Sequence, residues 1–171
     1  MSSDTFTTAL FLITAVIAAG VLISAIFPVV YQMSGTFSSA SHESDQRLRT
    51  DFKIVLGVAN SSYYARVWMK NTGSERIPLA DIERSDVICG DAGNFGRLSF
   101  DPTSSGQMSP NTWRYTLSDL NSNSYWDSGE TLEIVALVPT IQTAEGSPVY
   151  YQFILPDGIW RSDQFTVGAT P

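Results

Sequence analysis

Residues 9–31, ALFLITAVIAAGVLISAIFPVVY, carry no charge, and the uncharged stretch extends from Thr5 to Ser41. At about 1.5 Å per residue, a helix over 9–31 reaches about 34 Å, enough to cross a hydrocarbon core about 30 Å thick. Its polar interruptions, Thr14 and Ser24, can donate hydroxyl hydrogen bonds to carbonyls in the preceding turn. The run therefore predicts one membrane-crossing helix that anchors the rest of the chain.

Small residues and one proline mark this predicted anchor. Because small side chains let helices approach closely, in lipid or in a filament core, we expect them to form one packing side of the helix. The alternative is that they reflect only the general Ala and Gly content of membrane helices. Pro28 should kink the last turns without ending the span. The packing residues are Ala15, Ala18, Ala19, Gly20 and Ser24.

The flanks of the run bear on processing and orientation. The segment MSSDTFTT lacks the basic residues of a secretory signal, so we expect a retained anchor. Arg47 and Arg49 are offset by neighbouring acids, so the positive-inside rule leans only weakly towards a cytoplasmic head. A glycosylation sequon at Asn60 and a net charge of −7 favour the outside. We predict a single-pass protein of the cell membrane whose head lies outside the cytoplasm.

Three regions follow from the change in pattern along the chain. We predict an apolar anchor over 1–31, a polar stalk over 32–50 that continues the helix to about Leu48, and a head over 51–171. Gly35 is a point at which the stalk helix can break.

Short apolar runs separated by Gly, Pro, Asn and Asp dominate the head, which indicates strands and turns. The Gly-rich segment CGDAGNFG follows a strand and opens no helix, so its glycines are interpreted as turn residues. About eight strands with no helical period predict an all-β immunoglobulin-like sandwich behind the N-terminal transmembrane or filament-core helix. The predicted strands are 51–58, 63–70, 82–89, 96–100, 113–117, 131–138, 149–155 and 164–167.

Catalytic chemistry finds little support in the sequence. The single histidine, His42, lies in the stalk, and the single cysteine, Cys89, lies at a strand end, so no Cys–His or Ser–His–Asp relay is indicated. Lys and Arg number 10 against 17 acidic residues, which argues against a nucleic-acid surface. We expect neither an enzyme nor a nucleic-acid partner.

One segment, residues 119–130, has the spacing of a calcium-binding loop. Counting Asp119 as position 1, side-chain oxygens fall at 1, 3, 5 and 9 and a glutamate at 12, as in an EF-hand. Ser124 stands where that loop prefers glycine, and a strand follows instead of a helix, so a hairpin turn rich in Asn, Asp and Ser is the alternative. The predicted structural Ca²⁺ ligands are Asp119, Asn121, Asn123, Tyr125 through its carbonyl, Asp127 and Glu130.

Aromatic residues of the head are best explained as core and strand-face residues. Trp126, in the predicted metal loop, is the aromatic that we expect to be exposed. A carbohydrate platform would need several exposed aromatics on one face, such as Trp126 with Trp160. An anchored adhesin or binding module is therefore a separate hypothesis.

Several segments resemble archaeal type IV pilin-like proteins, and among them the FlaG family of archaellum accessory proteins. The resemblance covers most of the chain, although each motif is short. These segments are ALFLITAVIAAGVLIS, LRTDFKIV, VWMKNTGSERIPLADI, DSGETLEIVAL and LPDGIWRSDQFTV.

The resemblance implies a role in the stator of the archaeal motility motor. It implies self-association, contact with a FlaF-like sandwich protein and with the S-layer, and a membrane-rooted head against which the rotor pushes. An archaellin or archaeal pilin filament subunit is the rival within the same resemblance. Such subunits begin with a basic leader, which MSSD does not resemble, so the accessory role is favoured.

Overall fold

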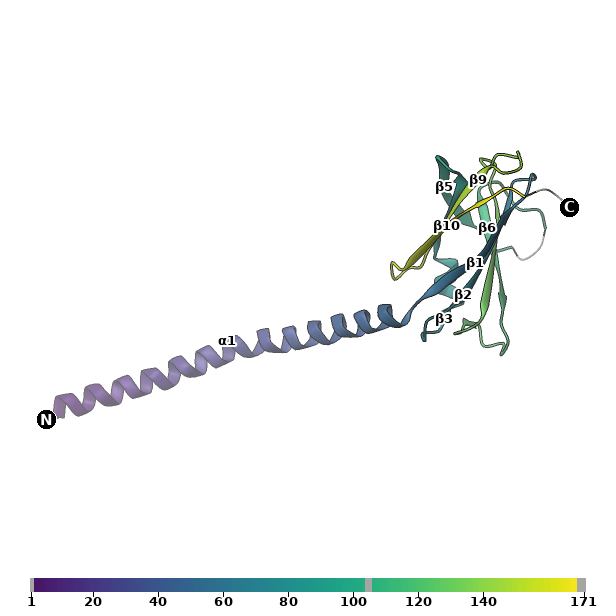
Figure 1. Ribbon diagram of the computed structural model, residues 1–171. Coiled ribbons are helices and arrows are strands. Elements are labelled where there is room, and N and C mark those ends of the chain that lie inside the picture. The colour runs from purple at the N-terminus through teal and green to yellow at the C-terminus, as the bar shows by residue number, and fades with distance from the viewer. Residues whose placement is uncertain (1, 104–105, 169–171) are drawn as a thin grey trace. The chain divides into compact units, whose positions relative to one another are not determined.

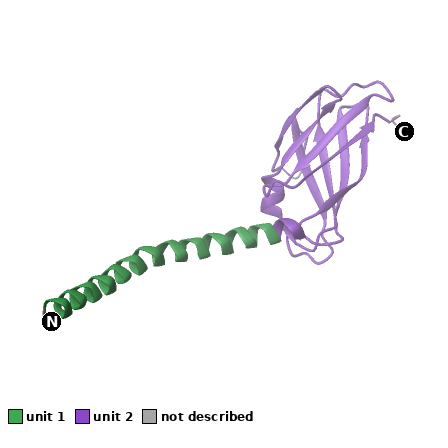
Figure 2. Ribbon diagram, turned by 60° about the vertical axis from the view of Figure 1, so that its left-hand side comes forward, with its two compact units in different colours: residues 1–45 green, residues 46–171 purple. Residues whose placement is uncertain are grey.

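The computed structural model describes residues 2–103 and 106–168. The chain divides into two compact units, residues 1–45 and 46–171, coloured separately in Figure 2. Helix α1 (Ser2–Arg49), which Figure 1 labels, makes up the first unit. Its last turn belongs to the second unit.

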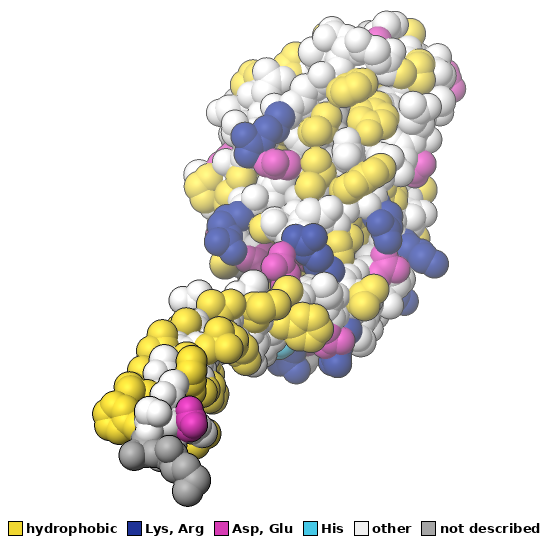
Figure 3. Space-filling model, turned by 90° about the vertical axis from the view of Figure 1, so that its left-hand side faces the viewer, with side chains coloured by type: hydrophobic (Ala, Val, Ile, Leu, Met, Phe, Trp, Pro, Cys, Tyr) yellow, Lys and Arg dark blue, Asp and Glu magenta, His cyan; other side chains and the backbone are white. Residues whose placement is uncertain are grey.

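Helix α1 is the one described helix that is long and apolar enough to cross a membrane. The hydroxyls of Thr14 and Ser24 donate to the carbonyls of Leu10 and Gly20, at 2.7 and 2.9 Å, as predicted. The helix runs through Pro28 and also through Gly35, where a break had been allowed. Every described side chain from residue 3 to 49 is exposed, and Figure 3 shows hydrophobic side chains along the helix.

The head, residues 46–171, is built from strands that follow the predicted apolar runs closely. Alternation of buried and less buried side chains is clearest in β2, β8 and β9, as expected for strands with one face on the core. The elements are β1 (Phe52–Ala59), β2 (Tyr64–Asn71), β3 (Ile77–Pro78), α2 (Leu79–Glu83), β4 (Asp86–Asp91), β5 (Asn94–Phe100), β6 (Thr112–Ser118), β7 (Tyr125–Trp126), β8 (Thr131–Leu137), β9 (Pro148–Ile154) and β10 (Trp160–Thr166).

Two four-stranded layers form the sandwich. One layer has the order β1-β2-β8-β6 and the other β5-β4-β9-β10, all joined antiparallel within each layer. A short parallel pairing of Ser99–Phe100 with Thr112–Trp113 links the layers along one side. An isolated parallel bridge between Ala59 and Val167 links β1 to the chain after β10. The two layers confirm the predicted sandwich. The two parallel links between them leave the sandwich nearly closed.

Aromatic side chains fill the space between the layers. Phe52 packs edge-on against Phe153 with ring centroids 5.5 Å apart, and Trp113 meets the same ring at 6.4 Å. Such perpendicular contacts match the quadrupoles of the rings. Trp113 and Tyr151 are buried, as expected, whereas Tyr63 and Trp160 are exposed.

Two local predictions about the head were wrong. The segment predicted as a strand from residue 82 begins inside helix α2, because a β3–α2 turn brings the buried Ile82 into the core before β4 starts. Of the glycines in CGDAGNFG, Gly93 lies in the hairpin turn, whereas Gly90 and Gly96 lie within β4 and β5.

Candidate functional site

The turn after β2 holds the chain where it leaves helix α1. The N–H groups of Ser74 and Glu75 donate to the carbonyl of Arg49, at 2.9 and 3.2 Å. The carbonyl of Asp51 accepts from Thr72 at 2.9 Å and from Gly73 at 2.8 Å. Four backbone hydrogen bonds therefore clasp residues 49–51.

Glycine at position 73 has a steric cause. A Cβ atom there would lie 2.2 Å from the Arg49 carbonyl oxygen and 2.5 Å from the Asp51 nitrogen. Both obstacles are backbone atoms that cannot rotate away. The glycine of the KNTGS segment is thus required by the close approach of two chain segments.

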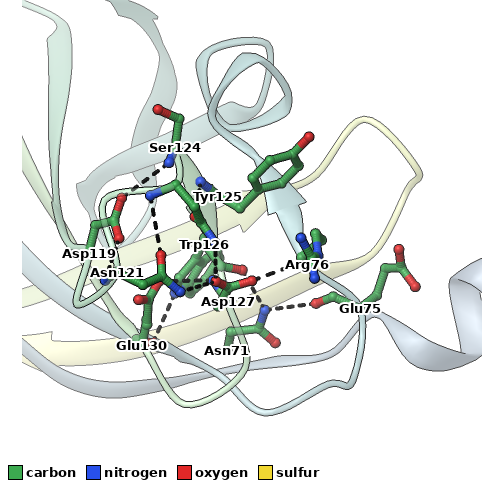
Figure 4. Close-up of polar contacts among 11 residues, drawn as sticks. Asn71, Glu75, Arg76, Asp119, Asn121, Ser124, Tyr125, Trp126, Asp127 and Glu130 are labelled. Carbon is green, nitrogen blue, oxygen red and sulfur yellow. Dashed lines mark hydrogen bonds and ion pairs between the residues drawn. The ribbon is translucent and has the colours of Figure 1, made fainter.

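Asn71, at the end of β2, joins this turn to the loop 119–130 (Figure 4). Its side chain is buried, and its Nδ2 donates to the carbonyls of Trp126 and Glu75 at 2.8 and 3.0 Å. Its Oδ1 accepts from the Gly73 N–H at 3.0 Å. The backbone of Asn71 also pairs with Glu130 and Gly129. We call this set, residues 49–51, 71–75 and 119–130, the junction.

Asp51 extends the junction towards strand β10. Its carboxylate accepts from the Thr72 hydroxyl at 3.2 Å and pairs with the guanidinium of Arg161. The same guanidinium lies 5.8 Å from the centroid of the Phe52 ring, within the range of a cation–π contact. The start of β1 is therefore fixed to strands β2 and β10.

The predicted calcium ligands lie together in the loop 119–130, and the five side-chain ligands accept hydrogen bonds within it. Asp119 accepts from the N–H groups of Asn121, Ser122 and Ser124. The Oδ2 of Asp127 accepts from the side-chain amides of Asn121 and Asn123, at 2.8 and 2.6 Å. These two amides, with Arg76 nearby, hold the pKa of Asp127 below its ordinary value.

Glu130 closes the loop from its last position. Glu130 is only 5% exposed, and its two carboxylate oxygens accept hydrogen bonds from the N–H groups of Leu120 and Asp127, each at 3.0 Å. Ser124, at the position that favours glycine, adopts a positive φ of 64°, so the backbone makes the sharp turn without glycine.

The calcium site stays a prediction. Among the described residues, no group of three or more His, Cys, Asp or Glu side chains is arranged to hold a metal ion. The donor set of the loop mixes carboxylates with amide and backbone oxygens, which Ca²⁺ accepts. Binding would require Asp127 to exchange its amide hydrogen bonds for the ion.

Trp126 is buried, which corrects the expectation that it is exposed. Its indole N–H donates to the Glu130 carbonyl at 2.9 Å, and its ring lies 5.8 Å from that of Phe52. Trp126 is therefore a core residue that ties the loop to the sandwich, and it cannot share an exposed platform with Trp160.

Asn60 lies in the turn between β1 and β2. Its Oδ1 accepts from the N–H groups of Ser62 and Tyr64, both at 3.1 Å, which shapes the turn. Glycosylation at this position stays a prediction.

The small residues of α1 do not share one side of the helix. At about 100° per residue, Ala15, Ala18 and Ala19 fall within one third of the circumference, whereas Gly20 and Ser24 fall on another side. All five are exposed in the isolated chain, and their role in helix packing stays a prediction.

Strand β1 presents apolar side chains to solvent. A bulge between Ile54 and Leu56 interrupts its pairing with β2, so the adjacent Val55 and Leu56 are both exposed, at 63% and 52%. Val58 is also exposed. On its other edge, β1 pairs through its backbone, among the described residues, only at the bridge between Ala59 and Val167, the residue that follows β10. We call Val55, Leu56 and Val58 the β1 patch.

Sequence reasoning missed the junction and the β1 patch. The signal for the junction was present in KNTGS, where turn-forming Asn, Gly and Ser follow the predicted strand 63–70. The signal for the patch was the run FKIVLGV, in which apolar and polar residues do not alternate as they do in a half-buried strand.

Known proteins are similar to this chain over most of its length. A protein from Archaeoglobus fulgidus, described as uncharacterized, is 24% identical over 169 residues, covering 97% of this chain and 99% of the relative. The solved archaellum periplasmic stator protein FlaG from Sulfolobus acidocaldarius is 17% identical, with a TM-score of 0.52 over 68% of this chain and 99% of its own.

The archaeal flagellum of Methanospirillum hungatei strain JF1 provides a second kind of structural relative. Its subunit is 12% identical with a TM-score of 0.54, and the match covers 91% of both chains. The family model of archaeal-type flagellin matches residues 2–165. The chain therefore belongs to the archaeal-type flagellin family and is an archaellum-related structural component.

Proposed function

We propose that the chain acts in the stator of the archaellum motor, anchored in the membrane by α1 with its head outside the cytoplasm. A rotor needs a stationary element to push against, and a membrane-rooted head that is held to the cell wall supplies one. The fold match along 99% of the FlaG chain supports this role. The solved FlaF–FlaG stator complex from Sulfolobus acidocaldarius is a further match, at 18% identity and a TM-score of 0.52.

The partner in this proposal is a FlaF-like sandwich protein, with the S-layer beyond it. The observation that carries the proposal is the β1 patch: three apolar side chains exposed on a strand whose bulge prevents the usual alternation. Exposed apolar side chains beside incompletely paired strand edges are favourable places for another sheet to add. Strand β1 begins at the junction, so a load on the patch would pass to residues 49–51 through backbone hydrogen bonds.

A filament subunit is the second candidate. The match to the flagellum of Methanospirillum hungatei favours it, because that alignment covers 91% of this chain and so includes much of α1. In that role α1 would pack in the filament core instead of in lipid.

Location in cells separates the two candidates. Mass spectrometry of the membrane fraction and of sheared filaments should recover a stator protein in the envelope, together with a second sandwich protein. Recovery in quantity from sheared filaments would move the chain to the subunit role.

A matched pair of variants tests the partner surface. Leu56→Asp should reduce co-purification of the sandwich partner at least tenfold, because it places a charge in an apolar contact. Thr116→Asp, at an exposed position on β6, adds the same charge elsewhere and should leave the yield unchanged. Equal yields from both variants would contradict the proposed surface.

We also propose that Ca²⁺, where bound, would act as a structural staple of the loop 119–130 and would play no catalytic part. The ligands would be Asp119, Asn121, Asn123, Asp127 and Glu130, with the Tyr125 carbonyl.

A further inference from the structure

Helix α1 carries a continuous apolar stripe with a period of 3.5 residues. Its members recur at alternating steps of four and three, which is the spacing of the a and d positions of a coiled coil. We call this stripe the α1 seam. It consists of Leu12, Val16, Ala19, Ile23, Ile26, Val30, Met33, Phe37 and Ala40.

The segment just after the predicted span distinguishes this stripe from lipid-facing residues. Residues 32–41 read QMSGTFSSAS, and their apolar side chains, Met33, Phe37 and Ala40, all lie on the α1 seam. Within the span, nearly every side of the helix is apolar, so contact with lipid alone explains the seam residues there. Beyond the span a one-sided stripe indicates contact with another helix, because water would favour polar residues on every side. Met33 and Phe37 are 68% and 76% exposed in the single chain.

The residues that weaken a helix lie away from the seam. Pro28 and Gly35 are seven positions apart and fall at the f position, on the side opposite the seam. The proline ring therefore does not obstruct an approaching helix. The helix keeps its backbone continuous through both residues.

A second copy of this chain fits the seam in a parallel arrangement. Two copies inserted in the same membrane in the same direction place identical seam residues at the same height. No charge lies between Thr5 and Ser41, so the copies do not repel each other there. The next a and d positions are Ser44 and Arg47, where identical copies would oppose polar and cationic side chains. The contact therefore ends after Ala40.

We propose that α1 pairs with the α1 of a second copy as a parallel, in-register coiled coil along the seam, which continues beyond the predicted span from Met33 to Ala40. The β-branched Val16, Ile23 and Val30 at the a positions favour two strands. The proposal rests on the membrane-anchored role above. It differs from filament packing, in which neighbouring subunits are displaced along the axis and identical residues do not meet.

A cysteine scan of the full chain in its membranes tests this pairing. The native Cys89 is buried, and replacing it with alanine leaves each introduced cysteine as the sole thiol. Ala40→Cys, on the seam, and Ser39→Cys, beside it, form the matched pair of small substitutions. Met33→Cys and Phe37→Cys extend the seam series, and Gly35→Cys and Ser38→Cys extend the control series. Labelling with a maleimide confirms that each thiol can be reached.

After mild oxidation, we expect same-residue disulfide dimers at 33, 37 and 40 in at least fivefold higher yield than at 35, 38 and 39. Equal yields, or a maximum at 35, 38 or 39, would overturn the proposal. Pairs of different variants supply a second readout. More disulfide between Met33→Cys and Ala40→Cys than within either alone would indicate staggered packing and would also overturn it.

The stability of the pair in detergent provides an independent measurement. Phe37→Glu should weaken dimerisation at least tenfold in sedimentation experiments, whereas Ser38→Glu should not. Equal effects would contradict the seam. The disulfide and sedimentation experiments report on helix pairing alone. Cell fractionation tests the stator role, so the failure of one proposal can be told from the failure of the other.

Discussion

The side-chain amide of Asn71 donates a hydrogen bond of 2.8 Å to the carbonyl of Trp126, a residue 55 positions later in the chain. Through this contact the turn that clasps residues 49–51 is fixed to the loop 119–130. Three segments distant in sequence thus meet around one buried amide, and removing this amide should destabilise all three.

Replacing Asn71 with alanine should lower the free energy of unfolding by about 2–4 kcal/mol. The change leaves the buried carbonyl of Trp126 and the part-buried carbonyl of Glu75 without their donor, and a buried unsatisfied acceptor costs about 1–3 kcal/mol. Urea unfolding of the full chain in detergent, followed by tryptophan fluorescence, measures the effect. Ser74→Ala, at an exposed position of the same turn, should change stability by less than about 0.5 kcal/mol. A similar loss of stability in both variants would contradict the role assigned to the buried amide of Asn71.

Gly73→Ala should destabilise the head by more than Gly96→Ala. The new methyl group at position 73 would meet backbone atoms at 2.2 and 2.5 Å, whereas nothing lies within 4 Å of a Cβ at position 96. We expect a loss of about 2–4 kcal/mol for the first variant and less than about 1 kcal/mol for the second. Thermal melts of the two proteins side by side decide the matter, and melting at the same temperature would be inconsistent with the clasp.

Acid should remove the stabilising effect of Asp101. Hydrogen bonds from Thr103 and then Arg114 lower the pKa of this carboxyl from 3.8 to about 2. A depressed pKa in the folded state means that the contribution is fully present above pH 3.8 and is lost as the pH falls through 2. The melting temperature of the native protein should exceed that of Asp101→Asn at neutral pH, and the gap should narrow between pH 4 and 2. A gap that is constant with pH would contradict the assigned interaction.

Calcium should raise the melting temperature if the loop 119–130 binds it. A site with so few carboxylates is expected to be weak, so the titration should extend to about 10 mM, with Mg²⁺ at the same concentration as a control. Asp127→Asn should abolish the shift. Identical melting curves with Ca²⁺, with Mg²⁺ and with a chelator would refute the predicted site and leave the loop as a hydrogen-bonded turn.

Cys89 should not react with a maleimide while the head is folded. Burial raises the pKa of its thiol to about 12, so hardly any thiolate forms at pH 8, and the side chain is closed to solvent. Labelling should appear only as urea unfolds the chain, in parallel with the change in fluorescence. Rapid labelling without denaturant would show that the core opens more readily than its packing indicates.

Local physical chemistry made much of the architecture predictable. A long uncharged apolar run has to be helical where water is absent, and the strands follow from short apolar segments between turn residues. The predicted strands 131–138 and 149–155 correspond to β8 and β9 for this reason. The hydroxyl hydrogen bonds of Thr14 and Ser24 were predictable because their partners lie four residues away.

Tertiary structure alone decided the burial of Trp126, the close approach at Gly73 and the exposure of the β1 patch. Each depends on which distant segment lies opposite: Glu130 and Phe52 for the indole, Arg49 and Asp51 for the glycine, and the bulged register with β2 for the patch. A sequence states the propensity of each residue, but the pairing of segments results from the packing of the whole core. That packing made an aromatic in a polar loop a core residue and placed apolar side chains of an edge strand on the surface.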